Sequence, residues 1–413
     1  MSAHEQFLQA IVEDPDNDLP RLVYADWLDE QGDPRGEYIR VQCELAQVGD
    51  YDPTRKPLEE RQNTLFKKHK SKWTKDLKVA AIRNYEFRRG FVEVVTLNAK
   101  NHLQNAEALL DRAPTIREMK INAMKTVLNE LLESKWLERL DSLNFTACQM
   151  GTRRLKRLLR SKHLKNIRKL NLTSNGLGHA GLVALATTES LPRLEKLKIW
   201  HLDFLAFDDL ADVARGRLWE QLTDVEVCHN NMTDIHIQSL ADNWPKCRWK
   251  RLSLAGCGLT DVGLKAILEN GHADPLEELN ICDNGALTDE GISQLATSDR
   301  LTNLKRLELN GCNIGLQALS ALMDSDTLSN VRRLSISPEV SVGLAIQTIA
   351  DGTGLPALEE LRLDTYSVKT KDLESLQQPG KFHQLKTLIY PSYFAEADVS
   401  AELNRLLSNV NVV

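Results

Sequence analysis

Residues 167–177, IRKLNLTSNGL, contain the pattern on which the rest of the chain is built. The defining residues of this stretch, at positions 1, 4, 6, 9 and 11, are Ile167, Leu170, Leu172, Asn175 and Leu177. Successive side chains of a strand alternate between its faces, so Leu170 and Leu172 point to one face and Asn171 to the other. Asn175 then satisfies backbone groups where the chain leaves the strand. One such unit cannot bury its apolar face alone, so it needs copies stacked on both sides.

The copies are present at nearly constant spacing. Blocks with this pattern begin at Leu140, Ile167, Leu194, Leu222, Trp249, Leu276, Leu304, Val331, Leu358 and Leu385, in steps of 27 or 28 residues. Position 9 carries residue types that suit a buried ladder, namely Cys148, Asn175, Asn230, Cys257, Asn284 and Cys312. Two weaker blocks begin at Val92 and Ile116, which brings the total to about twelve units.

Each strand block is followed by a segment with apolar residues at helical spacing. Such segments begin at Ala180, Asp261, Asp289 and Leu316 and predict amphipathic helices of about two to three turns. A strand and a helix in 27 or 28 residues resemble the ribonuclease-inhibitor-like class of leucine-rich repeats, over residues 92–413. The resemblance implies an α/β fold, a curved solenoid with parallel strands on its concave face and helices on its convex face.

Residues 1–50 differ from the repeats and predict a small all-α module. Helices are expected at 5–13, 19–31 and 35–47. Arg21, Asp26 and Arg40 are expected to form an internal charge network. The string from 7 to 42 contains RLVYADWL (21–28), GDPR (32–35) and IR (39–40), and it resembles the repeat-companion domain of many planctomycete-type bacterial proteins. That resemblance implies a bacterial accessory module in front of repeats, without an assigned activity.

Residues 51–91 are expected to hold a linker and a basic capping helix between the module and the solenoid. Residues 1–50 carry twelve acidic and three basic side chains, whereas residues 51–90 carry five acidic and twelve basic ones. The basic helices predicted at 67–78 and 153–160 contribute Lys67, Lys68, Lys70, Lys72, Arg153, Arg154, Lys156, Arg157 and Arg160. We interpret these residues as solvated faces. The alternatives are an acidic protein partner and a phosphate-rich polymer or anionic surface.

Composition and motifs narrow the function classes. A net charge of −6 and a pI near 6.0 give no global indication of nucleic-acid binding. No run approaches about 18 apolar residues, and the first residues lack a basic region before an apolar core, so we expect neither a membrane span nor a signal peptide. Seven cysteines, three of them at position 9, favour a reducing cytoplasm. No P-loop, GxGxxG, HExxH or CxxC motif occurs, so we expect no enzyme, no cofactor and no small-molecule substrate.

The predicted concave face can be written out from the strand positions that face solvent. Positions 2 and 3 alternate in charge between neighbouring blocks, which we interpret as lateral pairing along the sheet. Positions 5, 7 and 8 predict a contact cluster of Lys198, Trp200, His201, Glu226, Cys228, His229, Asn280 and Asp283, beside a depression at Ala255 and Gly256. An exposed Trp with charged neighbours is typical of a binding hot spot. In the alternative interpretation, Trp200 stacks on its neighbours and has no binding role.

The same cluster contains residue types that occur in metal and catalytic sites. His201 and His229 hold equivalent positions on adjacent strands and could share a metal, but Cys228 and Cys282 lie two strands apart, roughly 9–10 Å, too far for one tetrahedral site. Cys228 with either histidine would form a nucleophile pair, yet no oxyanion-hole loop accompanies it. We therefore expect no metal and no catalysis.

The sequence therefore predicts a non-enzymatic scaffold that binds a protein partner on the concave sheet face. Two alternatives remain open. One is a nucleic-acid or anionic-surface binder that uses the two basic helices. The other is an inhibitor or regulatory subunit of a partner enzyme.

Overall fold

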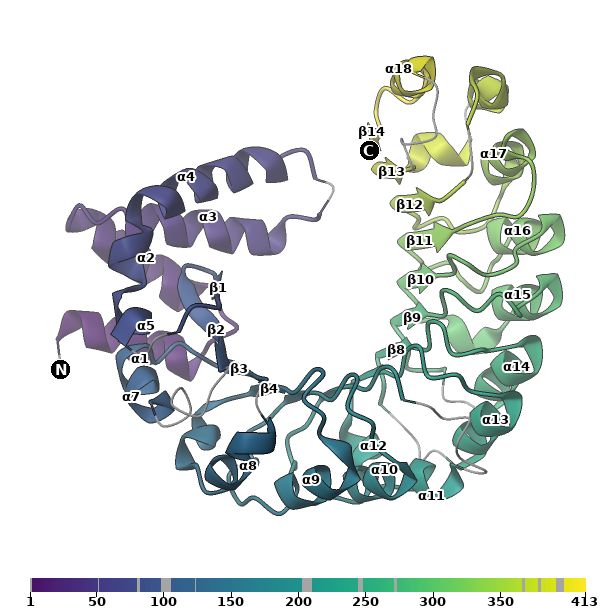
Figure 1. Cartoon of the computed structure of the whole chain (residues 1–413). Coiled ribbons are helices and arrows are strands. Elements are labelled where there is room, and N and C mark those ends of the chain that lie inside the picture. Colours follow the sequence, from purple (N-terminus) through teal and green to yellow (C-terminus); the bar gives the residue numbers. More distant parts are fainter. Residues whose placement is uncertain are drawn as a thin grey trace. The chain divides into compact units, whose positions relative to one another are not determined.

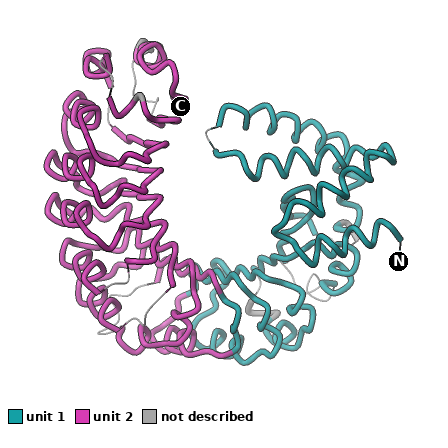
Figure 2. Tube along the Cα trace, turned by 180° about the vertical axis from the view of Figure 1, so that it is seen from behind, with its two compact units in different colours: residues 1–175, 190–194 teal, residues 176–189, 195–413 magenta. Residues whose placement is uncertain are grey.

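The structure is a computed structural model of the 413-residue chain, and it describes residues 2–50, 52–79, 82–97, 105–122, 124–202, 210–243, 248–270, 273–365, 368–377, 380–390 and 397–413. The chain divides into two compact units (Figure 2). Unit 1 comprises residues 1–175 and 190–194, and unit 2 comprises residues 176–189 and 195–413.

Unit 1 begins with helices and continues into the first repeats (Figure 1). Its helices are α1 (Ala3–Glu13), α2 (Leu19–Glu30), α3 (Arg35–Gln47), α4 (Arg55–Trp73), α5 (Lys75–Val79), α7 (Ala106–Arg112), α8 (Met124–Leu132), the 3-10 helix η1 (Lys135–Arg139) and α9 (Gly151–Leu158). Its strands are β1 (Tyr85–Arg88), β2 (Phe91–Leu97), β3 (Glu118–Ile121), β4 (Ser142–Asn144) and β5 (Lys169–Asn171). The three expected N-terminal helices are confirmed to within two residues.

The first helices start where local chemistry favours a helix N-terminus. Ser2 and Glu5 form a reciprocal capping box at the start of α1. Pro20 lies in the first turn of α2, where its missing N–H removes no hydrogen bond. α4 begins at Arg55, so this helix is longer than the predicted lysine-rich segment, and it ends at Trp73 before the short α5.

The helical module shares its core with the first strand of the repeats. Phe91 of β2 packs among Tyr24, Leu28 and Ile39 of α2 and α3. Arg21 of α2 pairs with Glu93 of β2 at 2.6 Å, and both side chains are almost fully buried. The expected network of Arg21, Asp26 and Arg40 is therefore wrong as a single network: Arg40 pairs at the surface with Asp26 and Asp29. Arg21 is buried instead, and its guanidinium donates to Glu93 and to the backbone carbonyls of Pro15 and Arg89.

Unit 2 contains the more regular repeats. Its strands are β6 (Lys196–Lys198), β7 (Asp224–Glu226), β8 (Arg251–Ser253), β9 (Glu278–Asn280), β10 (Arg306–Glu308), β11 (Arg333–Ile336), β12 (Glu360–Leu363), β13 (Thr387–Ile389) and β14 (Asn411–Val412). Its helices are α10 (His179–Ala186), α11 (Ala211–Ala214), α12 (Leu218–Gln221), α13 (Asp234–Asn243), α14 (Asp261–Glu269), α15 (Asp289–Ala296), η3 (Asp299–Leu301), α16 (Leu316–Met323), α17 (Val342–Asp351), η4 (Thr370–Gln377), η5 (Lys381–Gln384) and α18 (Ala397–Leu406).

Within unit 2 the strands lie on the inner side of an arc and the helices α13 to α17 on its outer side (Figures 1 and 2). All neighbouring strands from β6 to β14 are parallel. Position 4 is in register from strand to strand, as Val225, Leu252, Leu279, Leu307, Leu334, Leu361 and Leu388. These side chains are almost fully buried. The predicted solenoid of leucine-rich repeats, with strands in every predicted block and helices after them, is confirmed.

The position-9 ladder is also confirmed. Asn284 accepts from the backbone N–H groups of Cys257 and Leu259 at 3.0 and 2.9 Å, and its amide nitrogen donates to three backbone carbonyls. Asn175 makes the equivalent five bonds in unit 1. The cysteine thiols in the alternate repeats donate to a carbonyl of the preceding repeat, as Cys257 does to Val227 at 2.7 Å. The ladder thus satisfies the backbone groups that the turns leave behind.

In the part of the chain that the structure describes, every helix is too short or too polar to cross a membrane.

Candidate functional site

A cavity of about 490 Å³ lies on the inner face of unit 2, over the strands β6 to β10. Seven of the eight predicted contact residues line it, and the exception is His201. The strands place side chains of positions 3 and 5 on this face, and the turns after them add positions 7 and 8. We call this cavity the concave cavity; its predicted lining residues are Lys198, Trp200, Glu226, Cys228, His229, Asn280 and Asp283.

Trp200 is half-buried, which differs from the expected exposed side chain. The Lys198 ammonium lies 3.5 Å from the centre of the Trp200 ring and covers one of its faces. Lys198 is held there by an ion pair with Glu226 at 2.9 Å. The indole Nε1 of Trp200 is buried and has no hydrogen-bond partner among the described residues. The indole is thus positioned by its neighbours while one polar atom remains unsatisfied.

The two predicted histidines do come together. The rings of His201 and His229 are stacked, with centres 5.3 Å apart and planes 13° apart. Trp200 meets the His229 ring edge to face at 5.7 Å. An imidazole nitrogen binds a metal in the plane of its ring, so stacked rings do not direct both nitrogens at one ion. Over the described residues, no group of three or more His, Cys, Asp or Glu side chains could hold a metal ion.

At Gly256 the expected depression is occupied by His229, whereas Ala255 lines the concave cavity. A Cβ atom on Gly256 would lie 2.3 Å from Nδ1 of His229, so the imidazole fits only because this residue has no side chain. Gly256 also has a φ of +62°, which favours glycine. The prediction of an open depression is therefore wrong for Gly256 only, because the side chain at position 8 of one repeat lies over position 8 of the next.

Position 8 has the same left-handed backbone in successive repeats. The residues concerned are Ala147, Ser174, His201, His229, Gly256, Asp283 and Gly311, with φ between 53° and 71°. Because residues as different as Ala147 and His229 adopt it, this conformation belongs to the repeat turn and not to the site alone. A left-handed non-glycine residue costs roughly 1–2 kcal/mol, and the ladder of hydrogen bonds below the turn offsets that cost.

Charged side chains on the concave face pair laterally, as predicted. Asp224 accepts from Lys196 at 3.0 Å and from Arg251, which also approaches Glu278 at 3.8 Å. In the next row, hydrogen bonds from Lys305 and Lys250 lower the pKa of Glu277 to about 2. Neighbouring strands bring equal positions close together, so an alternation of sign along the sheet yields pairs.

The alternating charges at position 3 predict this pairing but do not by themselves indicate a place in the site. The structure places charged residues in the cavity lining that were missed: Asp224, Arg251, Glu278 and Arg306 at position 3, and Glu308 at position 5 of the block that begins at Leu304. Positions 3 and 5 share one strand face, and that period of two was the available signal.

Cys228 is buried, whereas a solvent-facing side chain was expected. Its sulfur lies 3.1 Å from Oγ of Ser253 on the adjacent strand. Burial raises the pKa of the Cys228 thiol and raises that of Cys282 to about 12. A thiol in this state is protonated at neutral pH and is a poor nucleophile.

The two basic segments of the alternative hypothesis lie in different parts of unit 1. Lys67, Lys68, Lys70 and Lys72 lie on α4, which packs on α3. Arg153, Arg154, Lys156, Arg157 and Arg160 lie on or just after α9, which packs on α8, with Leu155 and Leu158 buried beneath. Several of these groups already have partners, as Lys72 with Asp33 at 2.9 Å and Arg154 with a backbone carbonyl. The structure does not bring the two segments into one patch.

Comparison with known protein families identifies the repeats. Residues 163–186, 250–268, 275–296 and 300–323 match the family described as Leucine Rich repeat. Each segment contains a strand or a helix of the solenoid at the predicted place in its block. These segments are leucine-rich repeats.

None of the curated proteins compared with the chain matches it. Among solved structures, the Rad7 and Elc1 complex of yeast is similar at 16% identity over 72% of this chain and 85% of that chain, with a TM-score of 0.41. An internalin from Listeria monocytogenes is similar at 16% identity over 82% and 92%, with a TM-score of 0.41. A leucine-rich repeat protein of Leptospira interrogans is similar at 15% identity over 74% and 91%, with a TM-score of 0.36.

Proposed function

We propose that this leucine-rich repeat protein is a non-enzymatic scaffold that binds a partner protein through the concave face of unit 2. The supporting observation is the concave cavity, which is lined by the half-buried Trp200 and by charged side chains from five consecutive repeats. Its lining holds five carboxylates and three cationic side chains: Asp224, Glu226, Glu278, Asp283 and Glu308 against Lys198, Arg251 and Arg306. The excess of carboxylates favours a partner that inserts a basic side chain.

The repeat geometry suits this task. Stacked strands and the position-9 ladder hold the cavity residues in place before binding, which limits the entropy lost on association. Trp200 is the residue type that dominates binding energy at interfaces.

The test starts from partners captured from the native cell by affinity purification and identified by mass spectrometry. Trp200→Ala is expected to weaken binding of the captured partner by about tenfold or more in isothermal titration calorimetry. Glu278→Ala removes one cavity carboxylate and is expected to weaken it roughly fivefold.

The matched control is Glu360→Ala. Glu360 holds the same position 3, on β12, and pairs with Arg333 at 3.6 Å, but it lies outside the cavity. If Trp200→Ala and Glu278→Ala change the affinity no more than Glu360→Ala does, the concave cavity is not the binding site.

The N-terminal helices have a supporting role in this proposal. Residues 1–50 would cap the repeats of unit 1, because Phe91 and Glu93 of β2 are buried by α2 and α3. This is the arrangement that a repeat-companion module in front of a ribonuclease-inhibitor-like solenoid would have. The boundaries at residues 50 and 91 remain a prediction.

A further inference from the structure

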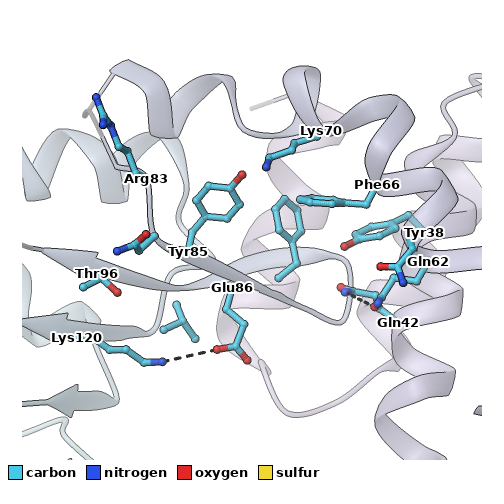
Figure 3. Close-up of a pocket in the computed structure, with 14 residues that line it drawn as sticks. Tyr38, Gln42, Gln62, Phe66, Lys70, Arg83, Tyr85, Glu86, Thr96 and Lys120 are labelled. Carbon is cyan, nitrogen blue, oxygen red and sulfur yellow. Dashed lines mark hydrogen bonds and ion pairs between the residues drawn. The ribbon is translucent and has the colours of Figure 1, made fainter. Parts of the chain in front are cut away.

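A second cavity, of about 670 Å³, lies in unit 1 between β1 and α4 (Figure 3). Tyr85 points from β1 toward Lys70 of α4, and Glu86 points to the other side of β1, toward Lys120. An adjoining cavity of about 470 Å³ shares Lys70, Arg83 and Tyr85 with it and adds Lys67. We call the two cavities together the N-terminal groove.

The N-terminal groove is basic. Lys67, Lys70 and Arg83 are exposed, and within the described ranges none of them has an ion pair. Glu86 is the only carboxylate among the described residues that line the groove. It is already shared between Arg88 at 2.8 Å and Lys120 at 3.9 Å. The groove therefore offers cationic groups without compensating anions.

The aromatic rings of the groove are not free stacking platforms. The Lys70 ammonium lies 5.6 Å from the centre of the Phe66 ring and 6.0 Å from that of Tyr85. Phe66 in turn packs edge to face on Phe87 at 5.3 Å. Single-stranded nucleic acids bind by stacking bases on exposed rings. Phe66 and Tyr85, which Lys70 covers, are therefore not free to stack on a base.

The backbone of β1 adds a second recognition element. β1 pairs antiparallel with β2 and stands at the end of the strand order, so its other edge has no strand partner among the described residues. In those residues, the backbone groups of Tyr85–Arg88 make no hydrogen bond outside this pairing. An unpaired strand edge accepts an added strand about 4.8 Å away.

We propose that the N-terminal groove binds an extended acidic segment of a partner protein. The segment adds a strand to the free edge of β1, and its carboxylates meet Lys67, Lys70 and Arg83. Charge complementarity selects this occupant, because the groove presents three unpaired cations next to a strand edge. This surface is separate from the concave cavity of unit 2, whose excess of carboxylates disfavours the same peptide.

The test uses the full chain and a fluorescein-labelled peptide in which Glu and Val alternate over seven residues, read by fluorescence anisotropy at low salt. The peptide with Lys in place of each Glu is the charge control. The double variant Lys70→Glu with Arg83→Glu is expected to weaken binding of the acidic peptide by about tenfold or more, because each substitution replaces a charge-assisted contact with repulsion. Lys68→Glu is the matched control, since Lys68 is exposed on the same helix but lines neither cavity.

N-methylation separates strand addition from attraction by charge alone. Alternate backbone N–H groups of an extended peptide point to opposite edges. Two forms of the acidic peptide are therefore used, each N-methylated along one of the two edges. The form methylated on the edge that faces β1 is expected to lose binding, and the other form is expected to keep it, because one edge of an added strand donates to the sheet.

Three outcomes overturn the proposal. The first is that Lys68→Glu weakens the acidic peptide as much as the double variant. The second is equal binding by the two N-methylated forms. The third is that a 20-base-pair DNA duplex binds through Lys70 and Arg83 while the acidic peptide does not, which would make the groove a nucleic-acid site. Failure of the concave cavity test leaves this result unaffected, because the variants lie in different units.

Discussion

The concave cavity and the N-terminal groove differ in how each deals with charge. In the concave cavity, Asp224 and Arg251 pair across neighbouring strands, and Lys198 pairs with Glu226. In the N-terminal groove, Lys70 and Arg83 have no carboxylate partner among the described residues. The difference follows from repetition. A solenoid places equal positions side by side about 4.8 Å apart, so charges of alternating sign neutralise each other, whereas the non-repeated start of the chain has no such neighbours.

The two units also differ in the kind of contact that stabilises each of them. Unit 2 depends on a contact repeated in every block, while the helices of unit 1 are joined to β2 by contacts that occur once, above all the pair of Arg21 and Glu93. Single substitutions in the two units should therefore have different consequences for stability.

Arg21→Met should have the largest effect. Glu93 would remain buried without its partner, and breaking a buried ion pair from one side costs roughly 3–5 kcal/mol. Burial raises the pKa of Glu93 and lowers that of Arg21, so both charges depend on their mutual contact. Hydrogen exchange should show the loss of protection in α2 and β2. The double variant Arg21→Met with Glu93→Leu should recover most of the stability, and an equal loss in the double variant would show that the charge pair is not the anchor.

Asn175→Ala and Asn284→Ala compare the same ladder position in the two units. Each change leaves buried backbone donors unpaired and should destabilise its own unit by roughly 3 kcal/mol. Urea denaturation followed by hydrogen exchange assigns each loss to a unit. Cys312→Ala, which removes only a thiol bond at 3.2 Å, should cost about 1 kcal/mol. A large difference between the two asparagine variants would contradict a common ladder.

Gly256→Ala tests the histidine stack of the concave cavity. The added Cβ would displace His229, and alanine is strained in the left-handed backbone of this position. We therefore expect a loss of about 2 kcal/mol in the free energy of unfolding and a changed affinity for the partner. Gly285→Ala is the matched control, because the nearest atom to its added Cβ is a carbonyl oxygen at 3.9 Å. Thermal unfolding of both variants measures the difference. Equal melting temperatures would show that His229 does not need the space above Gly256.

Asp16→Asn should have the smallest effect and a defined pH dependence. The hydrogen bond from Arg117 lowers the pKa of Asp16 to about 2, from an ordinary value of 3.8. A lowered carboxylate pKa stabilises the fold above the unfolded value, and this contribution is lost as the pH falls toward about 2. Because the Asp16 side chain is 57% exposed, we expect a loss of less than about 1 kcal/mol at pH 7.

The difference between Asp16→Asn and the unchanged chain should disappear near pH 2 in urea titrations. Asp14→Asn is the control, since Asp14 accepts from Asn17 at the surface and has no ion pair within the described residues. A difference that persists at pH 2 would show that Asp16 acts by something other than its charge.

The repeats could be predicted from the sequence because their physics is local and periodic. The spacing of Leu170 and Leu172 fixes a strand face, and the same spacing every 27 or 28 residues fixes the stack. The buried state of the position-9 residues followed from the same pattern. These are properties of one repeat and the repeats next to it.

Contacts between particular side chains could not be predicted in this way. The Lys198 ammonium covers the Trp200 ring, and the Cys228 sulfur lies beside Oγ of Ser253, through side-chain conformations that the repeat pattern does not specify. His229 lies over Gly256 because both residues have a left-handed backbone, which the pattern does not specify either. The N-terminal groove was missed for another reason. It arises where α4 meets β1, and neither element belongs to a repeat.

The cysteines of the position-9 ladder allow the local opening of individual repeats to be measured. Cys148, Cys257 and Cys312 are free thiols that are almost fully buried, so local opening of the surrounding repeat is needed to expose them. The rate at which an alkylating reagent modifies each sulfur therefore reports how often the repeat around it opens. One experiment on the unmodified chain can thus compare how often the early and the late repeats come apart.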